Sequence, residues 1–130
     1  MLTPSVKHFV FTLKTPLNYV PGQFITMHIQ RDDKILRRSY SIANPPNAQH
    51  QLELAAGFVK DGPGTQLLFN LKPGDTLETT GPFGRLTLKE EDPIRYVFIA
   101  TSTGITPYRA MMPELTKRLN ANPNLHVVIL

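Results

Sequence analysis

The 130-residue sequence contains no cysteine. This absence excludes disulfide bonds, a thiol nucleophile and an iron–sulfur cluster held by thiolates within the chain. No apolar run approaches the roughly 18 residues of a membrane-spanning helix, and residues 1–14 hold no continuous apolar segment of the kind found in signal peptides. We therefore expect no membrane span, and a reducing compartment, the cytoplasm, fits a chain without cysteine.

Groups that bind metals or carry out nucleophilic catalysis are also scarce. The four histidines show no metal-ligand spacing and no cluster, so we predict no metal site. No combination of serine, histidine and aspartate suits nucleophilic catalysis. If the protein is an enzyme, the sequence favours chemistry supplied by a cofactor.

The composition nevertheless indicates a folded domain. Hydrophobic residues make up 41% of the chain and charged residues 18%, which is enough for a core and too little charge for disorder. Twelve prolines favour many turns and strand edges. The net charge of +4 favours an anionic ligand or an acidic partner. A basic run interleaved with aromatic residues is missing, so nucleic acid is a weak alternative.

Alternating apolar residues separated by turn signals run through the first ninety residues. They predict a mainly β fold, a six-stranded antiparallel barrel with one short helix that Thr65 caps. The expected strands are 6–13, 24–30, 36–43, 52–59, 76–80 and 85–88, and the expected helix is 65–71. Pro21-Gly22 is expected to form a turn.

The pattern changes after residue 91. Residues 96–100 form a continuous apolar run, typical of a strand buried on both faces. A loop at 101–106, a helix at 108–119 and a strand at 126–130 complete a single βαβ unit, and Pro113 should kink the helix or shift its start. We therefore divide the chain into a barrel, 1–91, and a partial α/β unit, 92–130. A two-stranded parallel sheet leaves a face and an edge uncovered, so we expect a truncated unit or one completed by a partner chain or second copy.

Three short motifs carry candidate binding chemistry. Arg38-Ser39-Tyr40-Ser41 lies on the third strand, where Arg38 and Tyr40 point to one face and the serines to the other. Gly62-Pro63-Gly64-Thr65 opens the short helix, whose free N–H groups suit a pyrophosphate. Residues 101–107 follow a buried strand and open a helix, the context of a phosphate loop. Each motif alone is also compatible with a plain surface strand, a capped turn or a strand-to-helix connection.

The order and spacing of the three motifs resemble the ferredoxin-NADP reductase superfamily over nearly the whole chain. Members of that superfamily share an Arg-x-Tyr-Ser flavin motif, a glycine-bearing pyrophosphate turn before a helix, and a Thr-Gly-x-x-Pro loop. Residues 20–24, 71–75 and 81–84 are similar to further family segments. The resemblance implies a Greek-key FAD-binding barrel followed by the first βαβ of a domain that binds NAD(P)H.

The resemblance also implies roles for individual residues. Arg38 would bind the flavin phosphate, Tyr40 would stack on the isoalloxazine, and Ser41 would act catalytically beside flavin N5. The other implied cofactor-binding residues are Ser39, Ala56, Gly57, Phe58, Gly62, Gly64 and Thr65 for FAD, and Thr103, Gly104 and Pro107 for the nicotinamide dinucleotide.

The sequence leaves three candidate functions open. The first is a flavin-dependent oxidoreductase that passes electrons between NAD(P)H and a separate protein or small-molecule acceptor, with this chain binding flavin better than it turns over NAD(P)H. The second is a non-catalytic flavin-binding module that needs a partner chain or a second copy. The third is a basic barrel that binds nucleic acid. A basic cluster, Arg31, Lys34 and Arg37, is either solvated surface or a docking site for an acidic electron carrier.

Overall fold

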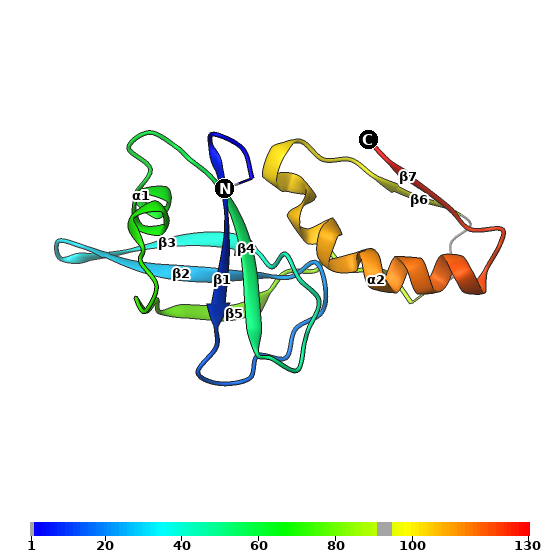
Figure 1. The fold of residues 1–130 in the computed structure, drawn as a ribbon, viewed down its shortest axis with the longest axis horizontal. Helices are drawn as coiled ribbons and strands as arrows, with labels where there is room; N and C mark the ends of the chain where they lie inside the picture. The colour runs from blue at the N-terminus through cyan, green and yellow to red at the C-terminus, as the bar shows by residue number, and fades with distance from the viewer. Residues whose placement is uncertain (1, 91–94) are drawn as a thin grey trace.

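A computed structural model of the chain describes residues 2–90 and 95–130. The first part contains five strands and a helix: β1 (Val6–Thr12), β2 (Phe24–Arg31), β3 (Lys34–Ser41), β4 (Gln51–Gly57), α1 (Pro63–Asn70) and β5 (Thr79–Phe83). The second part contains β6 (Arg95–Phe98), the 3-10 helix η1 (Ser102–Ile105), α2 (Thr106–Ala121) and β7 (His126–Ile129). Figure 1 shows the two parts side by side, with α1 at the far side of the barrel from α2.

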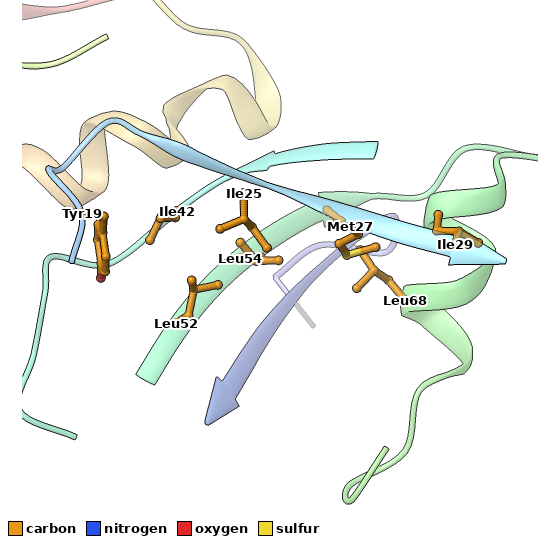
Figure 2. Close-up of a cluster of buried hydrophobic side chains, with 9 residues drawn as sticks. Tyr19, Ile25, Met27, Ile29, Ile42, Leu52, Leu54 and Leu68 are labelled. Carbon is orange, nitrogen blue, oxygen red and sulfur yellow. The ribbon is translucent and has the colours of Figure 1, made fainter. Parts of the chain in front are cut away.

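Two antiparallel sheets form the barrel. One pairs β1 with β4, and the other has the order β3-β2-β5. Alternate residues of the strands point into the space between the sheets, as period-two geometry requires. Figure 2 shows the resulting core, in which side chains from β2 and β4 meet Leu68 of α1. Met27 and Leu54 are completely buried there.

The barrel strands confirm most of the predicted fold, with two corrections. The predicted strand 76–80 lies instead at Thr79–Phe83, and residues 85–88 do not form a strand. Pro82 is tolerated inside β5 because, among the strands that the structure describes, β5 pairs with β2 alone. Residues 85–88 form a local turn, in which the Thr87 N–H donates to the Arg85 carbonyl at 2.9 Å.

The predicted turn at Pro21-Gly22 is confirmed. The segment 84–88, which leads to the second part, packs against Gly22 of this turn. Gly22 has φ +104°, a conformation that favours glycine. A Cβ at this position would lie 1.8 Å from the Leu86 carbonyl oxygen. The segment therefore passes directly over the Gly22 backbone on its way to β6.

The second part is a single βαβ unit, as predicted, with β6 and β7 parallel. The predicted domain boundary at 91/92 lies outside the described residues. Helix α2 begins two residues earlier than expected and contains Pro113 within it. Its buried residues Met111 and Leu115 pack against Phe98.

Within the described residues, the sheet of the second part is covered on one face only. Tyr96, Phe98 and Val127 face α2, whereas Val97 and Ile99 are 52% and 68% exposed. The expectation of a strand buried on both faces is therefore wrong for residues 96–100 in this chain. A second layer would be needed to cover the other face.

Among the described residues, no helix is long and apolar enough to cross a bilayer.

Candidate functional site

The strand β3 separates the residues of the Arg38–Ser41 motif as predicted. Arg38 pairs with Met27 and Tyr40 pairs with Ile25 across the β2–β3 ladder, so both follow the core side of the sheet. Ser39 lies on the opposite face, where its hydroxyl is 3.1 Å from the hydroxyl of Thr26. Of the four motif residues, Arg38 and Tyr40 are therefore the pair directed toward α1.

The N-terminus of α1 packs directly on this pair of side chains. A Cβ added to Gly64 would lie 2.5 Å from the Tyr40 hydroxyl oxygen and 3.1 Å from Arg38 Cγ. Only glycine fits here without displacing a neighbour, although the backbone of Gly64 is not in the left-handed region. The structure thus brings two motifs, separated by more than twenty residues in sequence, into one contact.

The first turn of α1 presents backbone donors at this contact. Helix termini leave their first N–H groups without an intrahelical acceptor. Within residues 2–90 and 95–130, no hydrogen bond uses the N–H of Gly64 or of Thr65. These two donors and the helix dipole suit an anionic group placed beside Arg38.

Thr65 has a different role from the predicted cap. The helix begins at Pro63, a residue well suited to the first helical position, so Thr65 lies inside the first turn. Its buried hydroxyl donates to the carbonyls of Val59 and Gly62 and accepts from the Val59 N–H at 3.2 Å. The Thr65 side chain therefore closes the loop 59–65, and its backbone N–H has no acceptor among the described residues.

Arg38 is exposed and has no carboxylate partner within the described residues; its Nη1 donates to the Arg37 carbonyl at 2.7 Å. Burial raises the pKa of Tyr40 above its ordinary value, and the positive charge of Arg38 partly opposes this shift. Tyr40 therefore stays a neutral phenol at physiological pH. The pair offers a planar cation and an aromatic face with a hydroxyl, which suit a phosphate and a flat ring respectively.

The other predicted FAD-binding residues lie around the end of β4. Ala56 is buried in the barrel, and Gly62 forms the N-cap of α1. Phe58 donates its backbone N–H to the Ser5 carbonyl at 2.7 Å, and its ring lies 5.4 Å from the ring of Phe69. Phe58 thus packs on α1, and its N–H is already bonded within the barrel.

The third motif approaches the barrel at Gly57. A Cβ placed on Gly57 would lie 4.0 Å from Thr103 Cγ2. The Thr106 hydroxyl donates to the Thr103 carbonyl at 2.6 Å, and Pro107 is buried in the first turn of α2. Gly104 donates its N–H to Thr101 and is exposed. The expected nicotinamide loop therefore lies beside β4.

Sequence reasoning missed one connection between the two parts. Arg109, in the first turn of α2, donates from Nη1 to the Ala43 carbonyl at 2.8 Å and to Glu53 Oε2 at 2.6 Å. The same carboxylate oxygen lies 2.8 Å from His8 Nε2. Neither residue belongs to a motif, and their contact joins positions far apart in sequence, so no local pattern could have indicated it.

The sequence analysis also did not identify Tyr19 and Asn44, whose hydrogen bonds hold the segment that follows β3. Buried Tyr19 donates its hydroxyl to the Asn44 carbonyl at 3.1 Å, and the Asn44 side chain binds the backbone of Gln51 and Glu53. Burial, with a smaller contribution from the negative charge of Glu53, raises the pKa of Tyr19 to about 12. These bonds fix the turn that follows Ser41.

This pKa predicts how stability changes in alkali. Between the ordinary value of 10.0 and about 12, the unfolded chain loses the Tyr19 proton and the folded chain keeps it. Stability should therefore fall as pH rises through that window, by at most about 2–3 kcal/mol. Urea unfolding at pH 9 and at pH 11.5 measures the change, and Tyr19→Phe should reduce it. An equal loss in the variant would contradict the assignment.

Comparison with known proteins decides the family. The sequence profile of the oxidoreductase FAD-binding domain matches residues 1–88. This chain belongs to that family. The match confirms the resemblance to the ferredoxin-NADP reductase superfamily and the barrel that it implied.

Curated relatives and solved structures agree with this family. The chain is 36% identical over 109 residues to ferredoxin–NADP reductase B of Sorangium cellulosum, covering 84% of this chain and 43% of the relative. It is 35% identical over 97 residues to reductase component 1 of terephthalate 1,2-dioxygenase from a Comamonas species, covering 75% of this chain and 28% of the relative. The crystal structure of an Amycolatopsis cytochrome P450 reductase superposes with a TM-score of 0.77 at 27% identity, covering 96% of this chain and 38% of that one. The chain thus spans less than half the length of these relatives.

Proposed function

We propose that this chain is the flavin-binding part of an oxidoreductase that passes electrons between NAD(P)H and a separate acceptor through FAD. The observation that carries the proposal is the contact of Gly64 with Arg38 and Tyr40, where a Cβ would fill the space beside the phenol. Bound FAD supplies the capacity to accept a hydride and to release electrons singly or in pairs. The named relatives, two reductases and a reductase component, support this reaction class.

The residues of the site would divide the work of binding. Arg38 and the N–H groups of Gly64 and Thr65 would bind the phosphates, because the Arg38 side chain lies against Gly64 in the first turn of α1. Tyr40 would pack its ring on the flavin and keep its proton. Ser41, half-buried at the end of β3, would donate or accept a hydrogen bond at the reacting edge of the ring. The loop 103–107 would orient the nicotinamide.

Anaerobic mixing tests the proposed reaction. The FAD-loaded chain is mixed with NADPH or NADH, and the visible flavin absorbance is followed over time. Bleaching by either nucleotide supports the proposal. A chain that binds FAD and is bleached by neither favours the second candidate function, a flavin-binding module that needs a partner chain or a second copy.

A specific observation motivates that second candidate. The sheet face formed by Val97, Ile99 and Leu130 is exposed, and an apolar face of a parallel sheet is normally covered. Light scattering after size-exclusion chromatography separates the cases, since a strict monomer would argue against self-association. The cytoplasmic location expected from the sequence stays a prediction.

The separate acceptor is proposed to be an acidic electron carrier. Arg31, at the end of β2, pairs with Lys34, at the start of β3, at the tip of the hairpin. Arg37 lies three residues beyond Lys34 on β3, and all three side chains are exposed. Such a cluster raises the association rate of an acidic protein by long-range attraction, which salt screens.

Neutralising this cluster should slow docking. In the triple glutamine variant of Arg31, Lys34 and Arg37, the association rate with an acidic plant-type ferredoxin should fall roughly 10-fold at low salt. Surface plasmon resonance at low and high ionic strength measures it. The difference from the unaltered protein should vanish at high salt; a difference that persists there, or is missing at low salt, would exclude this docking site.

A further inference from the structure

The outer face of β4 holds the second part of the molecule at two points. Glu53, Ala55 and Gly57 share this face, because Leu52, Leu54 and Ala56 alternate with them and are buried in the barrel core. Glu53 binds Arg109 of α2, and Gly57 lies against Thr103 of η1. The two points are four residues apart on the strand, about 13 Å.

Two separated points fix an orientation as well as a position. At Gly57 the strand offers no side chain, and Thr103 approaches its backbone with no hydrogen bond between the two residues in the described part of the chain. The Arg109 contact is directional, since one guanidinium nitrogen donates to both the Glu53 carboxylate and the Ala43 carbonyl. Ala43 is buried and lies two residues beyond Ser41. Arg109 therefore joins the start of α2 to the chain that leaves the flavin strand.

The carboxylate end of this contact is itself held in place. Glu53 Oε2 is bonded to His8 Nε2 as well as to Arg109, and the Glu53 side chain is 19% exposed. Although burial alone would favour the neutral acid, the hydrogen bonds from Arg109 and His8 outweigh it and hold the pKa of Glu53 below its ordinary value. Glu53 is therefore charged at neutral pH, and β1, β4 and α2 meet at one oxygen.

We infer that Arg109 is a positioning residue, which sets how the loop 103–107 approaches Ser41 by tying α2 to Glu53 and to the Ala43 carbonyl. Arg109 does not contact the Arg38–Tyr40–Gly64 site in the described residues, so it acts through the loop and not on FAD. The inference rests on the proposed function for its meaning in catalysis, but the attachment itself is a structural claim. Half-exposed ion pairs contribute little to stability. Loss of the Arg109 side chain is therefore expected to change how the two parts are placed relative to each other, and to change the stability of the fold little.

Distance measurement between the two parts tests the attachment. Because the chain has no cysteine, Asn70→Cys and Lys117→Cys provide two unique sites for spin labels on exposed residues of α1 and α2. Pulsed dipolar spectroscopy of the labelled full chain should give one narrow distance distribution. Arg109→Ala should give a broad or shifted distribution, and Arg37→Ala, the removal of an exposed arginine elsewhere on the barrel, should leave it narrow.

Two further sets of measurements use Glu53, the partner of Arg109, and the bound flavin. Glu53→Ala should broaden the distance distribution as Arg109→Ala does. The variant that carries both substitutions should have a distribution no broader than either single variant, because the two residues act as a unit. The FAD dissociation constant should change less than about twofold in Arg109→Ala, while the limiting rate of flavin reduction by saturating NADPH falls about 10-fold or more. An Arg109→Ala distribution identical to the parent would overturn the inference. Loss of FAD binding in the parent itself would instead refute the proposed function.

Discussion

Replacing Gly64 by alanine is expected to weaken FAD binding roughly 5- to 150-fold while leaving the barrel folded. The added methyl group would lie 2.5 Å from the Tyr40 hydroxyl oxygen, so the tyrosine ring must move. Alanine favours the helix over glycine, and the backbone of Gly64 is not left-handed, so the helix itself is not destabilised. Titration of the apoprotein with FAD, followed by flavin fluorescence, measures the effect.

Two further variants show whether the clash with Tyr40 is the cause. In Tyr40→Phe the clashing oxygen is gone, so adding Gly64→Ala to that variant should weaken FAD binding less than it does in the parent. Gly104→Ala is the matched control, because its Cβ would make an ordinary 3.7 Å contact with Ala100. If Gly64→Ala binds FAD as tightly as the parent, the cofactor does not occupy this contact.

Replacing Arg38 by methionine should weaken FAD binding roughly 10- to 150-fold. Methionine keeps much of the length of the side chain and removes the guanidinium, and charge-assisted hydrogen bonds are each worth about 1.5–3 kcal/mol. Arg38 has no carboxylate partner among the described residues, so no buried anion is left behind by its removal. Loss of affinity would therefore report on the ligand rather than on the fold.

The adjacent residue provides a matched control. Arg37 lies on the opposite face of β3, where it pairs with His28. Arg37→Met removes the same charge one position away and should change the FAD dissociation constant less than about twofold. Equal losses for the two variants would show that FAD responds to net charge alone. Arg38→Lys should fall between methionine and arginine, because lysine keeps the charge without the planar fork.

The local pattern of the sequence predicted most of the fold. Period-two alternation located both ends of the first four strands within two residues and placed Arg38 and Tyr40 on one face, because burial on one side of a sheet imposes that period. It failed at β5, where Gly81-Pro82 reads as a turn. In the structure the ladder continues to Phe83, which pairs with Phe24 at a ring distance of 5.9 Å. The partner strand, invisible in a local window, decides this element.

The residues of the candidate site were predicted from the sequence, but the contacts between them were not. The motif residues were found by resemblance, whereas the packing of Gly64 on Tyr40 depends on how α1 crosses the end of β3. Thr65 was predicted to cap the helix, yet its hydroxyl closes the loop 59–65. Arg109 and Glu53 belong to no motif, and only the tertiary fold brings them together.

We propose that the surface formed by Arg38, Tyr40 and the N-terminus of α1 binds FAD. The most direct test is the visible absorption spectrum of the chain after incubation with FAD and gel filtration, with Gly64→Ala and Gly104→Ala treated in parallel. We expect flavin absorbance to elute with the parent chain and with Gly104→Ala, and to be strongly reduced with Gly64→Ala. A folded parent chain that elutes without flavin would contradict it.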